Sequence, residues 1–223
     1  GVRHFLRKYP PARLEPGDVL ISNDPWLISG HKHDFTVVTP FFLDERPTGW
    51  TANTCHVADI GGRVFSADAP TVFEEGLLIP ILKLYRRGEP NEDLFTLLEE
   101  NVRVPREVLG DIGAQVASNE VGNRKVVAYL RKKGLDSLES LSDAIIENTE
   151  AATRRAVAKV PPGEYSHEIH MDGFEEPLVI RIAIRIEGDQ LTADYAGTDP
   201  ESPNGINSVM NYTEAYTTYA LKC

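Results

Sequence analysis

Short runs of apolar residues, separated by glycine, proline, asparagine and aspartate, dominate the first third of the chain. This punctuation is typical of β-strands joined by tight turns. The pattern predicts three strands, at residues 18–22 (DVLIS), 35–42 (FTVVTPFF) and 50–56. Residues 1–90 are therefore expected to form a β-rich region.

Residues 91–160 have a helical pattern, because their apolar positions recur every three or four residues. Asn91 is expected to cap a helix over residues 92–102 with its side chain. Pro105 suits the first turn of a second helix, which Gly134 would end in the left-handed conformation. A third helix would bury one stripe, formed by Leu138, Leu141, Ile145, Thr149, Ala152 and Ala156.

Residues 161–223 begin with a Pro-Pro-Gly linker, after which apolar residues recur at every second position. Arg181 and Arg185 would share the polar face of one half-buried strand. Its apolar face would consist of Leu178, Ile180, Ile182, Ile184 and Ile186. Residues 187–190 then predict a hairpin turn into a further short strand. Helices and antiparallel strands in successive regions predict an α+β fold.

The composition is that of a globular protein, with 41% hydrophobic and 26% charged residues. A net charge of −11 would repel a phosphate backbone, so nucleic acid is not an expected partner. No apolar run reaches the roughly 18–20 residues of a membrane-spanning helix. The two cysteines, Cys55 and Cys223, cannot form a disulfide framework, and the cytoplasm is the expected compartment. Since the chain begins at Gly1, we expect it to be an interior part of a longer protein.

Two matching motifs carry the candidate chemistry. His31 precedes Asp34 by three residues, as His56 precedes Asp59, and each pair lies at one end of a predicted strand. Imidazole and carboxylate groups without thiolate favour manganese, iron or catalytic zinc. A metal centre and a chance gathering of loop residues both explain this spacing. A separation of the two histidines by more than about 8 Å would exclude a shared ion, since ligand bonds measure about 2.0–2.2 Å.

Three neighbouring residues have alternative interpretations. His33 lies two residues from His31 and would face the opposite side of an extended segment, so we expect it at the surface or behind the ligands. Cys55 would likewise point away from His56, as a small buried hydrophobe rather than a catalytic thiol. Asp24 belongs to an Asn-Asp-Pro-Trp turn, where its carboxylate serves either the turn or a substrate pocket.

The sequence lacks the usual motifs for nucleotide and serine chemistry. Residues 59–62 (DIGG) are not followed by the lysine and the serine or threonine of a phosphate-binding loop. No Gly-x-Ser-x-Gly nucleophile elbow occurs either. If the reaction requires ATP, this chain is not expected to bind it.

Several blocks of the sequence resemble the hydantoinase B/oxoprolinase family and follow one another in the family's order. They are residues 17–26 (GDVLISNDPW), 30–40 (GHKHDFTVVTP), 56–62 (HVADIGG), 74–80 (EEGLLIP), 111–119 (DIGAQVASN) and 194–198 (DYAGT). The likeness covers nearly the whole chain. Because members of the family are longer, the resemblance implies an internal segment of such a subunit.

The resemblance implies ATP-dependent chemistry that is shared between two proteins. A hydantoinase A-type subunit would bind ATP with magnesium, and the B-type subunit would hold a divalent metal such as zinc, manganese or iron. His31 and His56 match the family's metal-binding histidines, and Asp34 is the carboxylate that this chain adds. Asp59 would orient His56 from behind, and Asp24 is a candidate catalytic residue.

The resemblance leaves the substrate and part of the ligand set open. Opening of a hydantoin, 5-oxoproline or lactam ring is the leading interpretation, and carboxylation of a ketone such as acetone or acetophenone is the alternative. A non-catalytic interaction subunit is the third hypothesis. Lys32 and His33 stand where the family often has Leu-Pro, which alters the expected pocket rim. The family also has acidic metal-site residues upstream of this segment, so Asp34 is either a ligand or a partner of the ligands.

Overall fold

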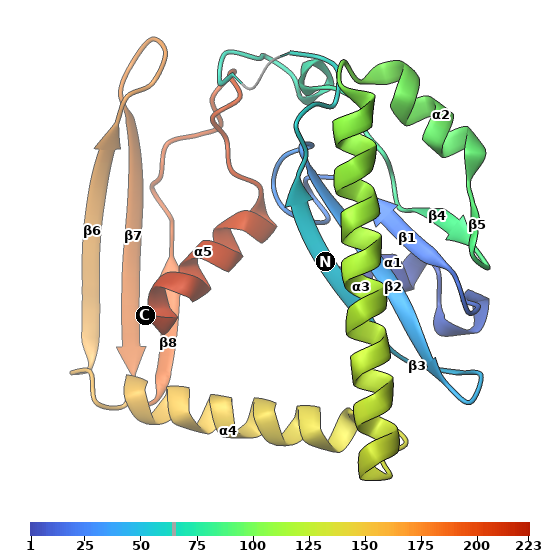
Figure 1. Ribbon diagram of the computed structural model, residues 1–223. Helices are drawn as coiled ribbons and strands as arrows, with labels where there is room; N and C mark the ends of the chain where they lie inside the picture. Colours follow the sequence, from blue (N-terminus) through green and yellow to red (C-terminus); the bar gives the residue numbers. More distant parts are fainter. Residues whose placement is uncertain (64–65) are drawn as a thin grey trace. The chain divides into compact units, whose positions relative to one another are not determined.

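A computed structural model describes residues 1–63 and 66–223, and it divides the chain into two units (Figure 1). The first unit comprises residues 1–138 and 208–214, and the second comprises residues 139–207 and 215–223. Antiparallel sheets and helices confirm the predicted α+β class. Among the described residues, no helix combines the length and the apolar character needed to cross a membrane.

A five-stranded antiparallel sheet, ordered β3-β2-β1-β4-β5, forms the centre of the first unit. Its strands are β1 (Val19–Ser22), β2 (Asp34–Leu43), β3 (Arg46–His56), β4 (Leu82–Arg86) and β5 (Glu89–Pro90). The three predicted strands are confirmed as β1, β2 and β3. β3 begins at Arg46 rather than at residue 50, so the β2–β3 hairpin is longer than expected.

Three α-helices and two short 3-10 turns complete the first unit up to residue 138. They are α1 (Val2–Lys8), α2 (Glu92–Asn101), α3 (Pro105–Lys133) and the turns Pro11–Arg13 and Val72–Glu75. Pro105 and Gly134 bound α3 as predicted, and Gly134 has a φ of 64°. Asn91 precedes α2, but its side chain does not cap the helix. Its Nδ2 instead donates to the Lys83 carbonyl oxygen at 3.0 Å, which ties the start of α2 to β4.

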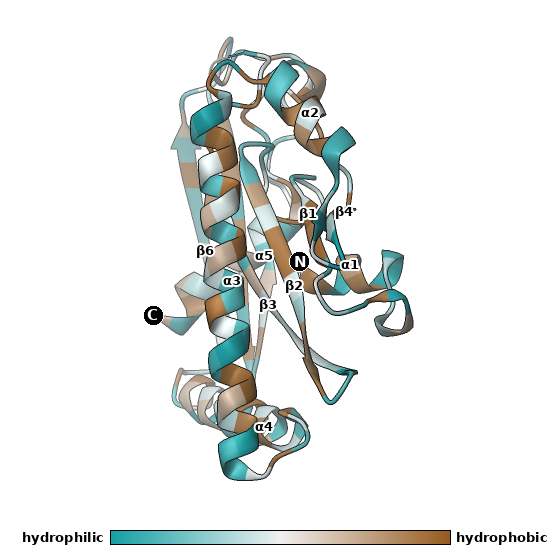
Figure 2. Ribbon diagram, turned by 45° about the vertical axis from the view of Figure 1, so that its right-hand side comes forward, coloured by the Kyte–Doolittle hydropathy of each residue, from teal (hydrophilic) through white to brown (hydrophobic). Residues whose placement is uncertain are grey.

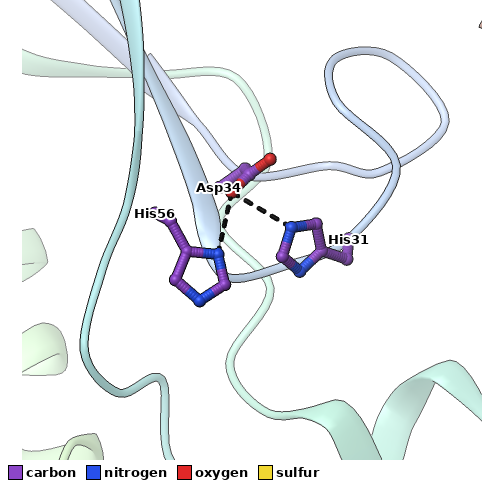
Figure 3. A group of neighbouring side chains, drawn as sticks. All are labelled: His31, Asp34 and His56. Carbon is purple, nitrogen blue, oxygen red and sulfur yellow. Dashed lines mark hydrogen bonds and ion pairs between the residues drawn. The ribbon is translucent and has the colours of Figure 1, made fainter. Parts of the chain in front are cut away.

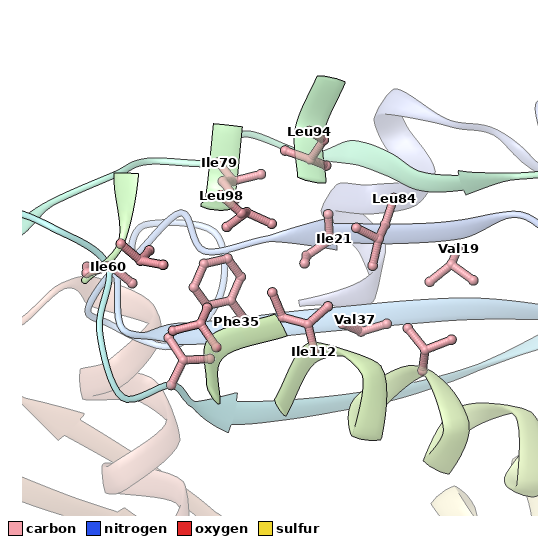
Figure 4. Close-up of a cluster of buried hydrophobic side chains, with 14 residues drawn as sticks. Val19, Ile21, Phe35, Val37, Ile60, Ile79, Leu84, Leu94, Leu98 and Ile112 are labelled. Atoms are coloured by element: carbon pink, nitrogen blue, oxygen red, sulfur yellow. The ribbon is translucent and has the colours of Figure 1, made fainter. Parts of the chain in front are cut away.

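Both faces of β1 and β2 are buried, which explains their unbroken apolar runs. Under α2 and α3 lies a cluster drawn in Figure 4. It contains Val19, Ile21, Phe35, Val37, Val57, Ile60, Ile79, Leu84, Leu94, Leu98, Val102, Val108, Ile112 and Val116. On the other face, Leu20 and Val38 pack with Phe5 of α1, Leu14 and Ile81. Figure 2 shows the corresponding hydrophobic stretch along β2.

Two buried amide side chains hold α3 against β2 and β3. Gln115 Nε2 donates to the Phe35 carbonyl oxygen at 2.8 Å, and Asn119 Nδ2 donates to the Val37 carbonyl oxygen at 3.1 Å. Asn53 of β3 donates in turn to Asn119 Oδ1 at 2.9 Å. Residues four apart lie on one helix face, so a single face of α3 makes these bonds. They help to fix the sheet end where β2 begins.

A three-stranded antiparallel sheet, ordered β6-β7-β8, forms the centre of the second unit. The elements are α4 (Glu139–Val157), β6 (Gly163–Met171), β7 (Leu178–Glu187), β8 (Gln190–Asp194) and the later part of α5 (Met210–Lys222). β7 is the predicted half-buried strand, with Ile186 buried and both Arg181 and Arg185 exposed. The predicted hairpin turn is confirmed by the pairing of Glu187 with Gln190.

The predicted burial of a stripe along α4 is wrong for the described residues. No residue of α4 is buried, and Leu141 and Ile145 are 43% and 57% exposed. Within the second unit, α4 contacts the sheet through β8, and only its C-terminal end lies at the ends of the strands (Figure 1). Because the helix does not lie along a sheet face, the sheet does not cover its apolar stripe.

Candidate metal centre

The β2–β3 hairpin brings Asp34 and His56 together at its open end. β2 begins at Asp34, β3 ends at His56, and the two residues pair directly across the strands. Residues that face each other in an antiparallel pair project from the same face of the sheet. Phe35 and Cys55, the next pair, project from the other face, and Phe35 enters the core. The hairpin register thus juxtaposes two of the candidate ligands.

A turn before β2 adds His31 to this pair. The amide of Asp34 donates to the His31 carbonyl oxygen at 3.3 Å. The preceding Gly30 has a φ of 99°, and a Cβ at this position would lie 2.9 Å from the ring of Tyr212. Glycine is therefore needed both for the backbone conformation and for the close approach. This turn directs the His31 ring back toward Asp34.

The three side chains converge on one carboxylate oxygen (Figure 3). His31 Nε2 and His56 Nδ1 each lie 3.1 Å from Asp34 Oδ1. The ring centroids of the two histidines are 4.9 Å apart, well inside the limit for a shared ion. Two atoms bound to one ion at about 2.0–2.2 Å are separated by roughly 3.0–3.4 Å. These residues therefore fit a divalent cation.

The composition and exposure of this group also suit a catalytic rather than a structural ion. Two imidazoles and one carboxylate supply three ligands and leave room for water or substrate. The His56 side chain is 54% exposed and the His31 side chain 28%, so the group is open to solvent. Nitrogen and oxygen donors without sulfur are compatible with zinc, manganese or iron.

A second group of neighbouring ligand atoms consists of His31, His33 and Glu75. Glu75 Oε1 lies 3.9 Å from Nδ1 of both histidines. His33 is only 5% exposed, and its ring stacks on the His56 ring with centroids 5.2 Å apart. Of the two expectations for His33, the surface position is wrong, and a position behind the ligands is observed. Residues 31–33 form a turn, so the alternation of an extended strand does not apply.

Glu75 is the neighbouring residue that motif reasoning left without a role. It ends the short Val72–Glu75 turn and accepts the Lys32 amide on Oε1 at 2.9 Å. Burial opposes its charge, but the neighbouring His33 ring, the bond from that amide and the His31 ring lower the pKa of Glu75 overall. Its place in residues 74–80, a block of the family resemblance, is the signal that points to it.

Two buried polar side chains join the loops on either side of the candidate centre. Lys32 is 2% exposed, and its Nζ donates to the Gly76 carbonyl oxygen at 2.9 Å. Burial lowers the pKa of Lys32. Asn23 is completely buried and donates to the carbonyl oxygens of Lys32 at 2.8 Å and Leu77 at 2.9 Å. Its Oδ1 accepts the Ile79 amide at 2.6 Å.

Asp59 lies in the loop after β3, and both of its carboxylate oxygens bond to Arg103. Arg103 Nε donates to Oδ1 at 2.9 Å, a second guanidinium nitrogen donates to the same oxygen, and the Arg103 amide donates to Oδ2. The structure therefore places Asp34, rather than Asp59, against His56. Through these bonds Asp59 joins its loop to Arg103, which lies in the segment between α2 and α3.

We expect Asp59→Asn to lower the free energy of unfolding by about 1–3 kcal/mol without loss of metal, because it weakens a buried charge-assisted contact. Burial opposes the charge of Asp59, but bonds from Arg103 dominate and hold its pKa below the ordinary value of an aspartate. The charged form thus contributes stability above that ordinary pKa, and the contribution is lost as pH falls through the depressed pKa. Urea unfolding at several pH values and metal analysis test the expectation. Normal stability with lost metal would assign Asp59 to the metal centre.

Asp24 and Cys55 lie outside both groups of neighbouring ligand atoms among the described residues. Asp24 Oδ1 accepts the Trp26 amide at 3.0 Å, which is the predicted turn, although the Trp26 side chain is not packed and is 56% exposed. Cys55 is half-buried, and burial, with the nearby Asp111 and Asp34, raises the pKa of its thiol. A protonated thiol is a poor nucleophile, which agrees with the non-catalytic interpretation.

The order of the sequence blocks and the histidines at the hairpin end point to one class of protein. The chain belongs to the hydantoinase B/oxoprolinase family, whose model matches residues 1–223. The resemblance seen in the sequence is thereby confirmed.

Known relatives of this chain are longer than the chain itself. The B-type subunit of a candidate D-/L-hydantoinase from Pseudomonas sp. (strain NS671) is 31% identical over 212 residues, which are 90% of this chain and 36% of the relative. The crystal structure of the ATP-dependent caprolactamase from Pseudomonas jessenii matches with a TM-score of 0.89 and 28% identity, over 99% of this chain and 38% of that one. The chain thus spans little more than a third of these relatives.

A more distant solved structure shares the fold. The nucleotide-free acetone carboxylase matches with a TM-score of 0.77 and 17% identity, over 91% of this chain and 29% of that chain. At this identity the likeness concerns the architecture alone. The same fold therefore occurs in a caprolactamase and in an acetone carboxylase.

Proposed function

We propose that this chain is the metal-binding part of the catalytic, B-type subunit of an ATP-dependent cyclic-amide hydrolase. The substrate would be a hydantoin, 5-oxoproline or a lactam. The observation that carries the proposal is the convergence of His31, Asp34 and His56 at the open end of one hairpin. Support comes from family membership and from the similarity to a hydantoinase subunit and a caprolactamase.

The proposed roles follow from the positions of the three side chains. A divalent cation held there would polarise a substrate carbonyl or lower the pKa of a bound water. Asp34, which faces both imidazoles, would supply negative charge and fix the orientation of the two rings. The exposed side of His56 leaves an approach for a small substrate. Asp24, 3.0 Å from the Trp26 amide, would contribute only to the shape of the neighbouring turn.

The proposal assigns ATP and its magnesium to a separate hydantoinase A-type subunit. This division is supported by the relative that is named as a subunit and by the ATP-dependent caprolactamase. The sequence of this chain also lacks a phosphate-binding loop motif. The chain's own residues would act on the ring substrate, and the partner subunit would activate it.

Two alternatives remain. An ATP-dependent ketone carboxylase is favoured by the shared fold of acetone carboxylase. Lys32 and His33, which stand where the family often has Leu-Pro, leave the choice of substrate open. A non-catalytic interaction subunit is favoured if the candidate centre holds no ion. Metal content below about 0.1 equivalent, after purification of the full-length subunit without chelator, would support this last hypothesis, since a structural or catalytic site binds stoichiometrically.

Turnover by the full-length subunit with its A-type partner should separate these hypotheses. We expect ATP hydrolysis to be stimulated by at least one of hydantoin, 5-oxoproline and a lactam, without any need for bicarbonate. Asp34→Ala should abolish this stimulation, because the two imidazoles lose their shared carboxylate. Bicarbonate-dependent turnover of ketones would instead establish the carboxylase. Turnover of neither class would contradict both enzymatic hypotheses.

A further inference from the structure

Glu75 approaches His31 from the side opposite to Asp34. His31 Nε2 lies 3.1 Å from Asp34 Oδ1, whereas His31 Nδ1 lies 3.9 Å from Glu75 Oε1. The two nitrogens of an imidazole point in different directions, so the ring stands between two carboxylates. If Nε2 binds a cation beside Asp34, the remaining ring N–H points toward Glu75.

Histidines that bind metals usually donate their second ring N–H to a carboxylate or a carbonyl oxygen. That bond selects the tautomer whose other nitrogen is free of a proton and can coordinate. We propose that Glu75 is the positioning residue for His31, accepting Nδ1–H and holding Nε2 toward the cation. This inference rests on the proposed metal site and adds a residue to it.

The distances favour a hydrogen bond over direct coordination of the same ion by Glu75. Glu75 Oε1 faces His31 Nδ1 at 3.9 Å, whereas Asp34 Oδ1 faces Nε2 at 3.1 Å, so Glu75 lies beside the nitrogen that a cation next to Asp34 would leave unbound. Glu75 Oε1 also already accepts the Lys32 amide at 2.9 Å. An approach of about 1 Å would bring His31 Nδ1 into hydrogen-bond range, and such bonds are often long before a site is loaded.

Lys32 fixes the loop that carries Glu75. Its amide bonds to the Glu75 carboxylate, and its Nζ bonds to the carbonyl oxygen of the next residue, Gly76. The ammonium also lies 5.8 Å from the centre of the Phe73 ring. Because Lys32 is adjacent to His31 in the chain, these contacts fix the position of the Glu75 loop relative to His31. The side-chain part of this anchor depends on a lysine that replaces the leucine of the family resemblance.

The test compares Glu75→Ala, Glu75→Gln and Glu74→Gln in the full-length subunit. Glu74 is the matched control because its carboxylate pairs with Arg63 at 3.1 Å instead of facing the histidines. We expect zinc to bind about 10–100-fold more weakly to Glu75→Ala, as measured by competition with a chromophoric chelator. Glu75→Gln keeps an oxygen for the Lys32 amide, so its zinc affinity should lie between those of the parent and the alanine variant. The zinc affinity of Glu74→Gln should match that of the parent.

A spectroscopic measurement distinguishes positioning from loop stability. We expect the visible absorption of the cobalt-substituted protein to change in Glu75→Ala and to be unaltered in Glu74→Gln, while circular dichroism is the same for all variants. Unchanged zinc affinity and cobalt spectrum in both Glu75 variants would refute the inference. Loss of a second metal equivalent would also overturn it, in favour of a second ion at His31, His33 and Glu75. If the parent binds no metal, the proposed function itself fails.

Discussion

His31→Ala and His56→Ala should each bind metal more than about 100-fold more weakly than the parent and lose cyclic-amide turnover to a similar extent. The reason is ligand number: a centre with three protein ligands retains two after either change, and even residues behind the ligands contribute about 10–100-fold. The fold should persist, because neither side chain belongs to the core under α2 and α3. Metal analysis, turnover and circular dichroism of the full-length variants test this expectation.

His33→Ala is the matched control for these two variants. His33 is buried beside the candidate ligands, but it does not belong to the group that meets at Asp34. Most of the metal and of the turnover should therefore remain after its replacement. An active, metal-loaded His56→Ala, or a His33→Ala without metal, would show that the centre is placed wrongly.

The second large effect is expected for Asn23→Ala, which should lower the free energy of unfolding by on the order of 3 kcal/mol. The completely buried Asn23 amide satisfies three backbone groups, the carbonyl oxygens of Lys32 and Leu77 and the amide of Ile79. Alanine leaves all three without this partner. Urea unfolding should show a reduced midpoint, and zinc affinity should fall because the loop around Lys32 loosens.

Two further variants control for the chemistry of Asn23. Asn101→Ala removes an exposed asparagine that bonds within its own helix, and it should change stability by less than about 0.5 kcal/mol. Asn23→Asp keeps an acceptor for the Ile79 amide but cannot donate to the two carbonyl oxygens. It should be at least as unstable as Asn23→Ala, because a buried carboxylate would face two carbonyl oxygens. Parent-like stability of Asn23→Ala would contradict the proposed anchoring of the two loops.

Local signals in the sequence predicted the first unit better than the second. Pro105 and Gly134 act through their own backbone preferences, so the bounds of α3 were predictable. Asn91 was correctly placed before α2, but its side chain had a choice of partners and bonds to the carbonyl of Lys83 on β4. The stripe along α4 has a clear period, yet burial requires a second surface, which the second unit does not place over Leu141.

At the candidate centre, too, some features could be predicted from local sequence patterns and others depend on tertiary contacts. The two motifs, together with the family resemblance, named His31, Asp34 and His56 as candidate ligands, and strand pairing places Asp34 opposite His56. Asp59 has the same spacing from His56, but Arg103, distant in sequence, binds its carboxylate. No spacing rule points to Glu75, because its loop reaches the histidines only through tertiary contacts.

By itself, the sequence determined the α+β class, the main strands and the bounds of α3, and it indicated the residue types of a candidate metal site with nitrogen and oxygen ligands. These depend on local propensity, side-chain period and ligand chemistry, all of which act within a few residues. Only the tertiary structure decided that Asp34 stands between the two histidines, that Asp59 turns to Arg103 and that Glu75 faces His31. These contacts join polar groups that lie far apart in the sequence, because each such group needs a hydrogen-bond partner in the folded chain. No short-range sequence pattern specifies which partner it finds.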